Sequence, residues 1–511
     1  MSPAAILKWV VFVQQDISLQ TFSLSVLFVF MLLILMFRFN RANDQKRKLN
    51  LPPSPPNKLP ILGHLHQLGT HPHRNLQILA QKHGPDLMLL HLGHAPTLVV
   101  TSAESAREIM KTHDHVFASR PASYINFSTI RTWLLHHIVS TGNRCAGFAF
   151  FSFLVQREYN RFGRVAFGRK YSGDHKAEVA EKKFGEIVKD VIHLLGVFNV
   201  GDFIPWLAWV NNFNGLNRKL EKTFQELDGF LEVVVEDHIN RKDERSRSSN
   251  GGGGGEEEEE EEEEDLVDVL LGIENDGSIG VSLGRDNIKA IISVTQLGFP
   301  ADMAADQPTT FKLGWVNQQS VWAMAELLRY PKIMKEVQEE VRGIAKGKPN
   351  VTENDLVKML YLQSVIKETL RLHPPATLLL PHESIELVKL QGYDIPANTR
   401  VIINAWAIGR NPISWREPEK FEPKRFMSSS IDYKGQHFQF IPFGAGRRGC
   451  PGTLFAISSI ELGLANLLYR YDWKLPDGAR EDELDMAESG PGSVTHMKSP
   501  LLVIATDHLY T

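Results

Sequence analysis

The segment from Pro442 to Gly452, PFGAGRRGCPG, constrains this chain more than any other. It holds Cys450, one of only two cysteines in 511 residues, in a loop with four glycines and two arginines. No second sulfur or histidine lies at zinc spacing, so the loop suits a single thiolate ligand to a large metal cofactor, for which haem is the natural candidate. Glycines let the backbone lie against a macrocycle, and Arg448 is placed to meet a propionate. The alternative is a free buried cysteine in a glycine-rich turn.

This loop resembles the haem-binding loop of the cytochrome P450 family, which runs Phe, two residues, Gly, one residue, Arg, one residue, Cys, one residue, Gly. Every slot is filled here, by Phe443, Gly446, Arg448, Cys450 and Gly452. The resemblance implies that Cys450 is the axial ligand to the iron of haem b, in a cofactor-binding loop that also includes Gly444. A thiolate ligand pushes electron density onto iron and favours O–O cleavage.

A second motif of the same family lies upstream. Glu368 and Arg371 are three residues apart and share one helical face, where they can pair. An exposed ion pair is the alternative, and it would contribute little stability. The resemblance implies that both residues lock with Arg425 to brace the haem-binding core. His382 takes a position where the family usually has a basic contact to a propionate; the alternative is a satisfied surface histidine.

The oxygen-activating helix of the family is altered in this chain. A long helix is expected to begin at Ser282 or Asp286, and the family pattern is a small residue, Gly, any residue, an acid and Thr. Alignment with residues 304–309 puts Asp306 on the glycine and Thr309 on the hydroxyl, so these two are the candidate catalytic residues. Pro308 would cost a continuous helix about 3 kcal/mol and one hydrogen bond.

Two further segments depart from the family pattern. Residues 121–163 contain no counterpart of the helix whose Trp and basic residues bind the propionates. This segment has two interpretations. It is either a second membrane-contacting patch, or the product of a disrupted reading frame or a retained intron. Residues 251–264 are five glycines and nine glutamates, a composition that cannot bury enough apolar surface to order itself, so we predict a disordered loop over 243–265.

The amino-terminal region predicts a membrane anchor. Residues 17–37 carry no charge and would span roughly 31 Å as a helix, enough to cross a bilayer. A cleaved signal peptide is less consistent with this length and with the lack of a small-residue cleavage site. Basic residues follow at 38–48, so the large domain is expected in the cytosol. The predicted organisation is an anchor over 1–38, a basic and proline-rich linker over 39–60, and a haem-thiolate catalytic domain over 61–511.

Net charge and cysteine count limit the possible functions and compartments of the chain. The net charge of -4 is too small to indicate nucleic-acid binding, and two cysteines make no disulfide framework, which fits a reducing compartment. Apolar runs at 87–92 and 97–100 around a Gly-His-Ala-Pro turn predict a β-hairpin. We therefore expect a mainly α protein with a small β region, namely a cytochrome P450 fold preceded by a single N-terminal transmembrane helix.

The resemblance, to plant microsomal cytochrome P450 monooxygenases, covers roughly residues 52–121, 163–240 and 322–508. It implies insertion of one oxygen atom from dioxygen into a small apolar molecule of plant specialised metabolism, at the endoplasmic reticulum membrane. Electrons would come from NADPH through NADPH-cytochrome P450 reductase, docking near Arg447 and Arg448. Two alternatives stay open. One is a haem-binding member that does not oxygenate, and the other is a non-catalytic membrane protein or defective translation product.

Overall fold

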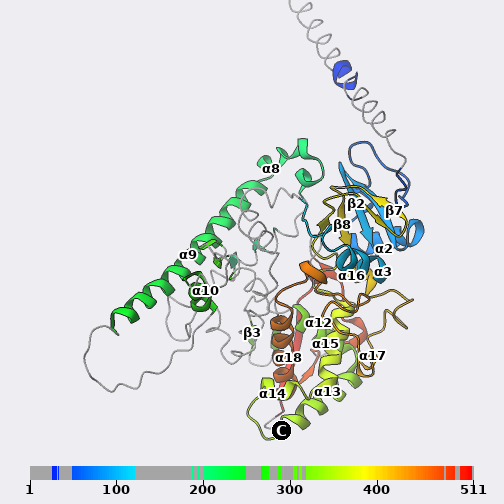
Figure 1. Cartoon of the computed structure of the whole chain (residues 1–511). Helices are drawn as coiled ribbons and strands as arrows, with labels where there is room; N and C mark the ends of the chain where they lie inside the picture. The colour runs from blue at the N-terminus through cyan, green and yellow to red at the C-terminus, as the bar shows by residue number, and fades with distance from the viewer. Residues whose placement is uncertain are drawn as a thin grey trace, which may run out of the picture. The chain divides into compact units, whose positions relative to one another are not determined.

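The structure is a computed structural model of the 511-residue chain (Figure 1). It describes residues 26–31, 33, 49–121, 199–248, 266–275, 303–307, 310–313, 318–476, 479–489 and 495–508, with single positions within 186–194 and 285–292. The chain divides into two compact units, one of residues 1–51 with 392–394 and one of the remaining residues. The larger unit is rich in helices and has a smaller β region, which confirms the predicted class.

Helices make up most of the described chain. The α-helices are α2 (Pro72–His83), α3 (Ala103–Arg107), α8 (Val210–Phe213), α9 (Leu216–Ser248), α10 (Leu266–Asn275), α12 (Gln318–Arg329), α13 (Pro331–Ile344), α14 (Glu353–Leu356), α15 (Leu360–Leu372), α16 (Ala405–Ile408), α17 (Lys424–Met427) and α18 (Thr453–Arg470). The 3-10 turns are η1 (Leu65–Gln67), η4 (Val200–Asp202), η5 (Pro205–Leu207), η7 (Gly446–Arg448) and η8 (Glu481–Glu483), and η2 (Glu108–Thr112) is a π-helix that continues α3.

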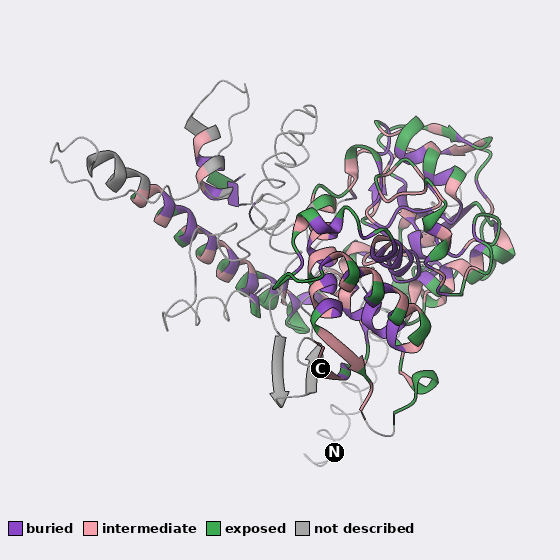
Figure 2. Ribbon diagram, turned by 90° about the horizontal axis from the view of Figure 1, so that it is seen from below, coloured by how far each residue is buried: buried purple, intermediate pink, exposed green. Residues whose placement is uncertain are grey.

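Four of these helices, α12, α13, α15 and α18, pack on one another and hold the main hydrophobic core. On α13 the buried residues Met334, Val337 and Val341 recur every three or four positions, which makes one apolar face. Pro331 begins that helix, where a missing N–H breaks no intrahelical bond. Buried residues gather inside this group of helices (Figure 2). The core supports both α15, with the Glu368 motif, and the cysteine loop that precedes α18.

The principal sheet has the strand order β1-β2-β8-β5. Strands β1 (Leu87–Leu92) and β2 (Ala95–Val100) form the predicted hairpin, with Leu92 opposite Ala95 and Gly93 at φ +58° in the turn. Strand β8 (Arg400–Ile403) pairs in parallel with β2, and β5 (His382–Glu383) pairs antiparallel with β8. This sheet therefore brings His382 into a fixed place. The short strands β6 (Val388–Leu390) and β7 (Tyr393–Ile395) lie between β5 and β8 in sequence.

A second sheet contains a segment that the sequence predicts as helix. Its strand order is β3 (Met303–Gln307), β4 (Thr310–Leu313), β12 (Leu501–Asp507) and β9 (Tyr471–Lys474). The expected distal helix is helical at the described positions 285–292, but residues 303–307 are a strand. Proline at 300 and 308 accounts for the difference, because proline lacks the N–H that a helix interior requires. Strands β10 (Glu488–Ser489) and β11 (His496–Met497) form a separate pair.

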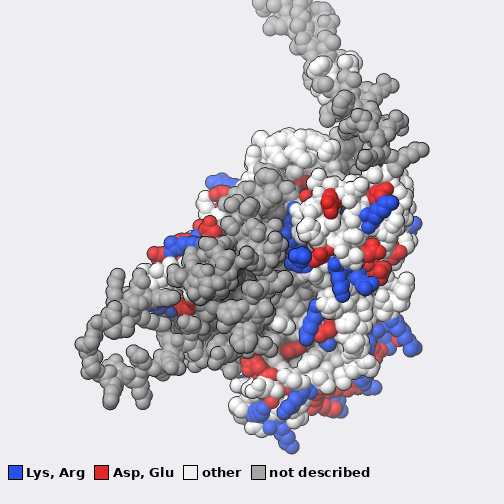
Figure 3. Space-filling model, viewed as in Figure 1, with Lys and Arg blue, Asp and Glu red and all other residues white. Residues whose placement is uncertain are grey.

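Helix α9 carries a buried stripe, visible in Figure 2, that packs against α10 and the 285–292 segment. Lys289 from that segment pairs with Asp228 on α9 at 3.0 Å. α9 continues to Ser248, so the first residues of the predicted 243–265 loop are helical. Residues 249–265 and 122–163 lie outside the described residues. On the face shown in Figure 3, acidic and basic side chains are interspersed.

Most of the predicted transmembrane segment, 17–37, also lies outside the described residues. Positions 26–31 and 33 are helical and exposed, and they include Leu27 and Phe28. Among the residues that the structure describes, no helix combines the length and the apolar character needed to cross a bilayer.

Candidate haem-thiolate site

The cysteine loop is shaped by two glycines in left-handed conformations. Gly444 and Gly446 have φ of +72° and +67°, which other residues adopt only with strain. A Cβ on Gly446 would lie 2.1 Å from the Met110 carbonyl oxygen, so only glycine lets η2 approach the loop this closely. The Cys450 N–H donates to the Phe443 carbonyl at 2.9 Å and closes the loop. Phe443 in turn contacts the Tyr433 ring edge-on at 6.3 Å.

Cys450 is the one cysteine among the described residues, and its thiol is free and accessible. Desolvation by the surrounding protein raises the pKa of the Cys450 thiol, while hydrogen bonds from the Gly452 backbone and the Thr453 side chain lower it. Such donors favour the thiolate over the thiol. An accessible sulfur with donors directed at it is suited to bind a metal whose other ligands come from elsewhere.

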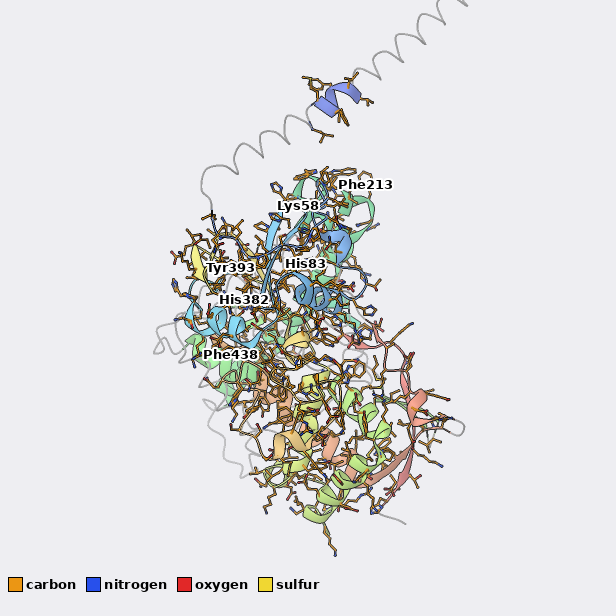
Figure 4. The ribbon with its side chains drawn as sticks, turned by 90° about the vertical axis from the view of Figure 1, so that its right-hand side faces the viewer. Lys58, His83, Phe213, His382, Tyr393 and Phe438 are labelled. Atoms are coloured by element: carbon orange, nitrogen blue, oxygen red, sulfur yellow. The ribbon has the colours of Figure 1, made fainter. Side chains whose placement is uncertain are left out.

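Two arginines, Arg448 and Arg120, and one histidine, His382, gather beside this loop. The Arg448 Nε donates to the Ala118 carbonyl at 2.6 Å. Arg120 donates from Nη1 to the carbonyls of Leu380 and Pro381 at 2.6 and 2.7 Å. The Nδ1 of His382, labelled in Figure 4, lies 2.8 Å from the Phe117 carbonyl and donates to it.

The two arginines lack a counter-charge in the described part of the chain. No described carboxylate pairs with Arg120, His382 or Arg448, and the buried Arg120 Nε has no partner. Burial first, and then the charge of Arg120, lowers the pKa of His382 to about 4, so this imidazole is neutral near pH 7. Burial, followed by the charge of Arg448, lowers the pKa of Arg120 to about 10. Cations held in this way bind an anion favourably, because it satisfies the orphaned donor and relieves their repulsion.

Haem fits this arrangement, since one accessible thiolate and an adjacent set of cations match its iron and its carboxylates. The residues that would hold it are Cys450 at the iron, and Arg448, Arg120 and His382 at the carboxylates. Arg120 was missed by sequence reasoning, although the Phe117–Pro121 stretch that carries it resembles the family. Its contacts run to residues 380 and 381, and nothing local in the sequence indicates such a pairing.

The Glu368 motif lies in the core rather than at the surface. Glu368 and Arg371 on α15 are paired by two hydrogen bonds of 2.7 and 2.8 Å, and both side chains are wholly buried. Arg425 donates from Nε to Glu368 at 2.9 Å. The structure therefore brings Glu368, Arg371 and Arg425 together. Arg371 also donates to the carbonyls of Gly409, Pro418 and Lys420, which ties α15 to the segment before α17.

The two candidate catalytic residues have a different placement. Asp306 lies on β3 at a register shift, since Ala305 pairs with Phe311 and Gln307 with Thr310. Its backbone therefore occupies a bulge and not a helical turn. The Asp306 side chain and all of Thr309 lie outside the described residues. Their roles stay predictions.

Three features of this structure are typical of haem-thiolate proteins. They are the cysteine loop, the arginines beside it, and the buried group of Glu368, Arg371 and Arg425. The family model described as "Cytochrome P450" matches residues 52–141 and 140–503. The chain therefore belongs to the cytochrome P450 family of monooxygenases.

Plant relatives are similar over nearly the whole length. Cytochrome P450 71A2 of Solanum melongena is 43% identical over 535 residues, covering 96% of this chain and 99% of the relative. Cytochrome P450 71A21 of Arabidopsis thaliana is 40% identical, covering 93% and 97%. Norfluorocurarine oxidase of a Strychnos species is 39% identical, covering 93% and 96%.

Proposed function

We propose that this chain uses a haem held by Cys450 to insert one oxygen atom from dioxygen into a small apolar molecule of plant specialised metabolism. Electrons come from NADPH through NADPH-cytochrome P450 reductase. The observation that carries the proposal is the accessible thiol of Cys450 beside two arginines, Arg120 and Arg448, that lack a described carboxylate partner. The identity to plant relatives, one of them named as an oxidase of norfluorocurarine, supports a small organic substrate.

Haem, when bound, supplies the iron at which dioxygen is reduced. The chain's own residues hold and orient it. Cys450 would provide a sulfur whose negative charge is favoured by the Gly452 N–H. Arg120 and Arg448 would neutralise the carboxylates of the haem, with the neutral His382 beside them. Glu368, Arg371 and Arg425 would brace the haem-binding core, because the buried Glu368 carboxylate is paired with both arginines. Asp306 and Thr309 are the proposed residues for proton delivery.

A second candidate function is haem binding without oxygenation. It is favoured by one observation, the strand at 303–307 where the family has an oxygen-activating helix. A strand gives no helical face on which an acid and a hydroxyl recur at a fixed spacing. In that case electrons taken from NADPH would reduce dioxygen without modifying a substrate.

Carbon monoxide spectra test the proposal. Reduced wild-type protein should show the strongly red-shifted Soret band of thiolate ligation, Cys450→Ser should lose it, and Cys145→Ser, at the only other cysteine, should keep it. A band that survives in Cys450→Ser would contradict the assignment. Product formation per NADPH consumed then separates the two candidate functions, because a non-oxygenating protein consumes NADPH and oxygen without product.

The proposed location is the endoplasmic reticulum membrane, with a single-pass anchor over 1–38, a linker over 39–60 and a cytosolic catalytic domain over 61–511. Exposed aromatic residues in the larger unit support a membrane contact. Trp206, Trp209 and Phe213, the last labelled in Figure 4, are 48%, 57% and 83% exposed. Such side chains are enriched where an apolar phase meets water. Deleting residues 1–38 should move the protein from the membrane pellet toward the soluble fraction, and unchanged sedimentation would contradict the anchor.

A further inference from the structure

One ion pair links the cysteine loop to the segment that braces it. The Arg447 Nε donates to the Asp114 Oδ2 at 2.7 Å. Arg447 belongs to η7, three residues before Cys450, and Asp114 follows the π-helix η2. The two side chains are 46% and 28% exposed, so this pair lies at the surface beside the cysteine loop.

The two arginines of the loop differ in how readily they can pair with a group from another protein. Arg448 is committed, since it is partly buried and donates to the Ala118 carbonyl at 2.6 Å. Arg447 has its described partner in Asp114 alone. Lys111, one helical turn before Asp114, is exposed and contacts Gln436 near the loop, without an ion pair to any described carboxylate. Asp114 is thus the one described carboxylate paired with this basic surface.

The position of Asp114 is fixed even though its ion pair is weak. The Met110 carbonyl packs against Gly446 so closely that a methyl group would not fit between them. The following segment, 116–120, is held by two backbone hydrogen bonds. The N–H groups of Glu383 and Ile385 donate to its Ser119 and Val116 carbonyls. An exposed ion pair contributes little to stability and is screened by salt. A carboxylate from another protein can therefore replace Asp114 without disturbing the fold.

We propose that Asp114 is an intramolecular competitor for the electron donor: a carboxylate of the flavoprotein reductase displaces it from Arg447 during docking. This inference rests on the proposed function, which brings a reductase to the loop. It identifies Arg447, and not Arg448, as the guanidinium that the partner contacts. It also means that in the free protein Asp114 is paired with the guanidinium that the reductase contacts. Removing the Asp114 charge should therefore strengthen the complex.

The test is a double-mutant cycle on the haem-loaded full-length protein, with Asp114→Asn, Arg447→Gln and the double variant. NADPH-dependent reduction is measured at rising reductase concentration and at two ionic strengths. Asp114→Asn should lower the reductase concentration for half-maximal rate by about 2- to 5-fold at low salt, and less at high salt. Arg447→Gln should raise it. The double variant should match Arg447→Gln, because Asp114 acts only through Arg447.

Controls separate docking from folding. Asp482→Asn breaks a comparable exposed pair, Arg480 with Asp482 at 2.8 Å, and should leave the docking curve unchanged. The carbon monoxide spectrum and the thermal midpoint of each variant report whether the loop is intact. Unchanged or weaker docking of Asp114→Asn, or a gain that persists in the double variant, would overturn the competition. A wild-type protein that holds haem but accepts no electrons from the reductase would overturn the proposed function and this inference with it.

Discussion

The Arg371 guanidinium and the Glu368 carboxylate, one helical turn apart on α15, face each other in parallel with neither side chain reaching solvent. Arg371 uses its remaining N–H groups on backbone carbonyls from three other residues, so the planar fork is fully occupied. Lysine offers a single charged nitrogen and cannot reproduce this geometry.

We therefore expect Arg371→Lys to destabilise the protein by about 3–5 kcal/mol, because it leaves a buried carboxylate incompletely paired. Urea unfolding of the haem-loaded protein measures this. Arg480→Lys, at an exposed pair with Asp482, is the control and should change stability little. A decrease in unfolding free energy below about 1 kcal/mol for Arg371→Lys would show that the buried pair does not depend on the guanidinium geometry of Arg371.

Arg120→Gln should weaken haem retention. The variant removes one of the two arginines proposed to hold the carboxylates. A charge-assisted hydrogen bond contributes roughly 1.5–3 kcal/mol, so haem should dissociate about 10-fold faster or more. Transfer of haem to an excess of apomyoglobin gives the rate. Arg410, also buried and with its pKa lowered to about 10 by burial, pairs with Glu419 and serves as the control. Equal haem loss from Arg410→Gln would mean that general destabilisation explains the effect.

Glu461 on α18 predicts a pH dependence of stability. Burial raises the pKa of this carboxyl from 4.5 to about 7, with Lys367 opposing the shift and Asp432 adding to it. The folded state therefore binds the proton more tightly than the unfolded chain does. The associated stability is full below pH 4.5 and is lost as pH rises to about 7.

Glu461→Gln should remove this loss, so the variant should exceed wild type at pH 8 by on the order of 1–3 kcal/mol and match it more closely at pH 5. Urea unfolding at several pH values measures the difference. The exposed Glu483, paired with Arg480, gives a control in Glu483→Gln. Parallel pH curves for wild type and Glu461→Gln would contradict the assignment.

Gly446→Ala should disrupt the cysteine loop. The backbone has φ +67° and the new methyl group would lie 2.1 Å from the Met110 carbonyl oxygen, so we expect a cost of at least about 2 kcal/mol and a diminished red-shifted Soret band. Gly463 on α18 is the matched control, since a Cβ there meets nothing within 4 Å. Gly463→Ala should stabilise the helix by roughly 0.5–1 kcal/mol. A Gly446→Ala protein with normal stability and spectrum would contradict this account of the loop.

Motifs with short sequence spacing were predictable. The pairing of Glu368 with Arg371 follows from helical periodicity, and the hairpin of β1 and β2 follows from two apolar runs separated by a turn. Fixed spacing also identified the cysteine loop, because five residue types in one order leave few alternatives. The fold class followed from the resemblance to the cytochrome P450 family that these motifs carry.

Contacts between distant segments were not predictable in the same way. Arg120 and residues 380–381 are far apart in sequence, as are Asp114 and Arg447, and neither pair has a periodicity that reveals it. The prolines at 300 and 308 indicated a broken helix, yet they could not show that the segment would pair with β12. Tertiary contacts decide such segments, and a single sequence does not encode them locally.

Strand β12 has a consequence for biosynthesis. It pairs with β4 on one side and β9 on the other, so both strands lack this neighbour until residues 501–507 are translated. The segment 310–313 leaves the ribosome on the order of ten seconds or more before its partner. During that interval the edge of β4 that faces away from β3 is open to other chains, and a chaperone has time to act on the nascent protein.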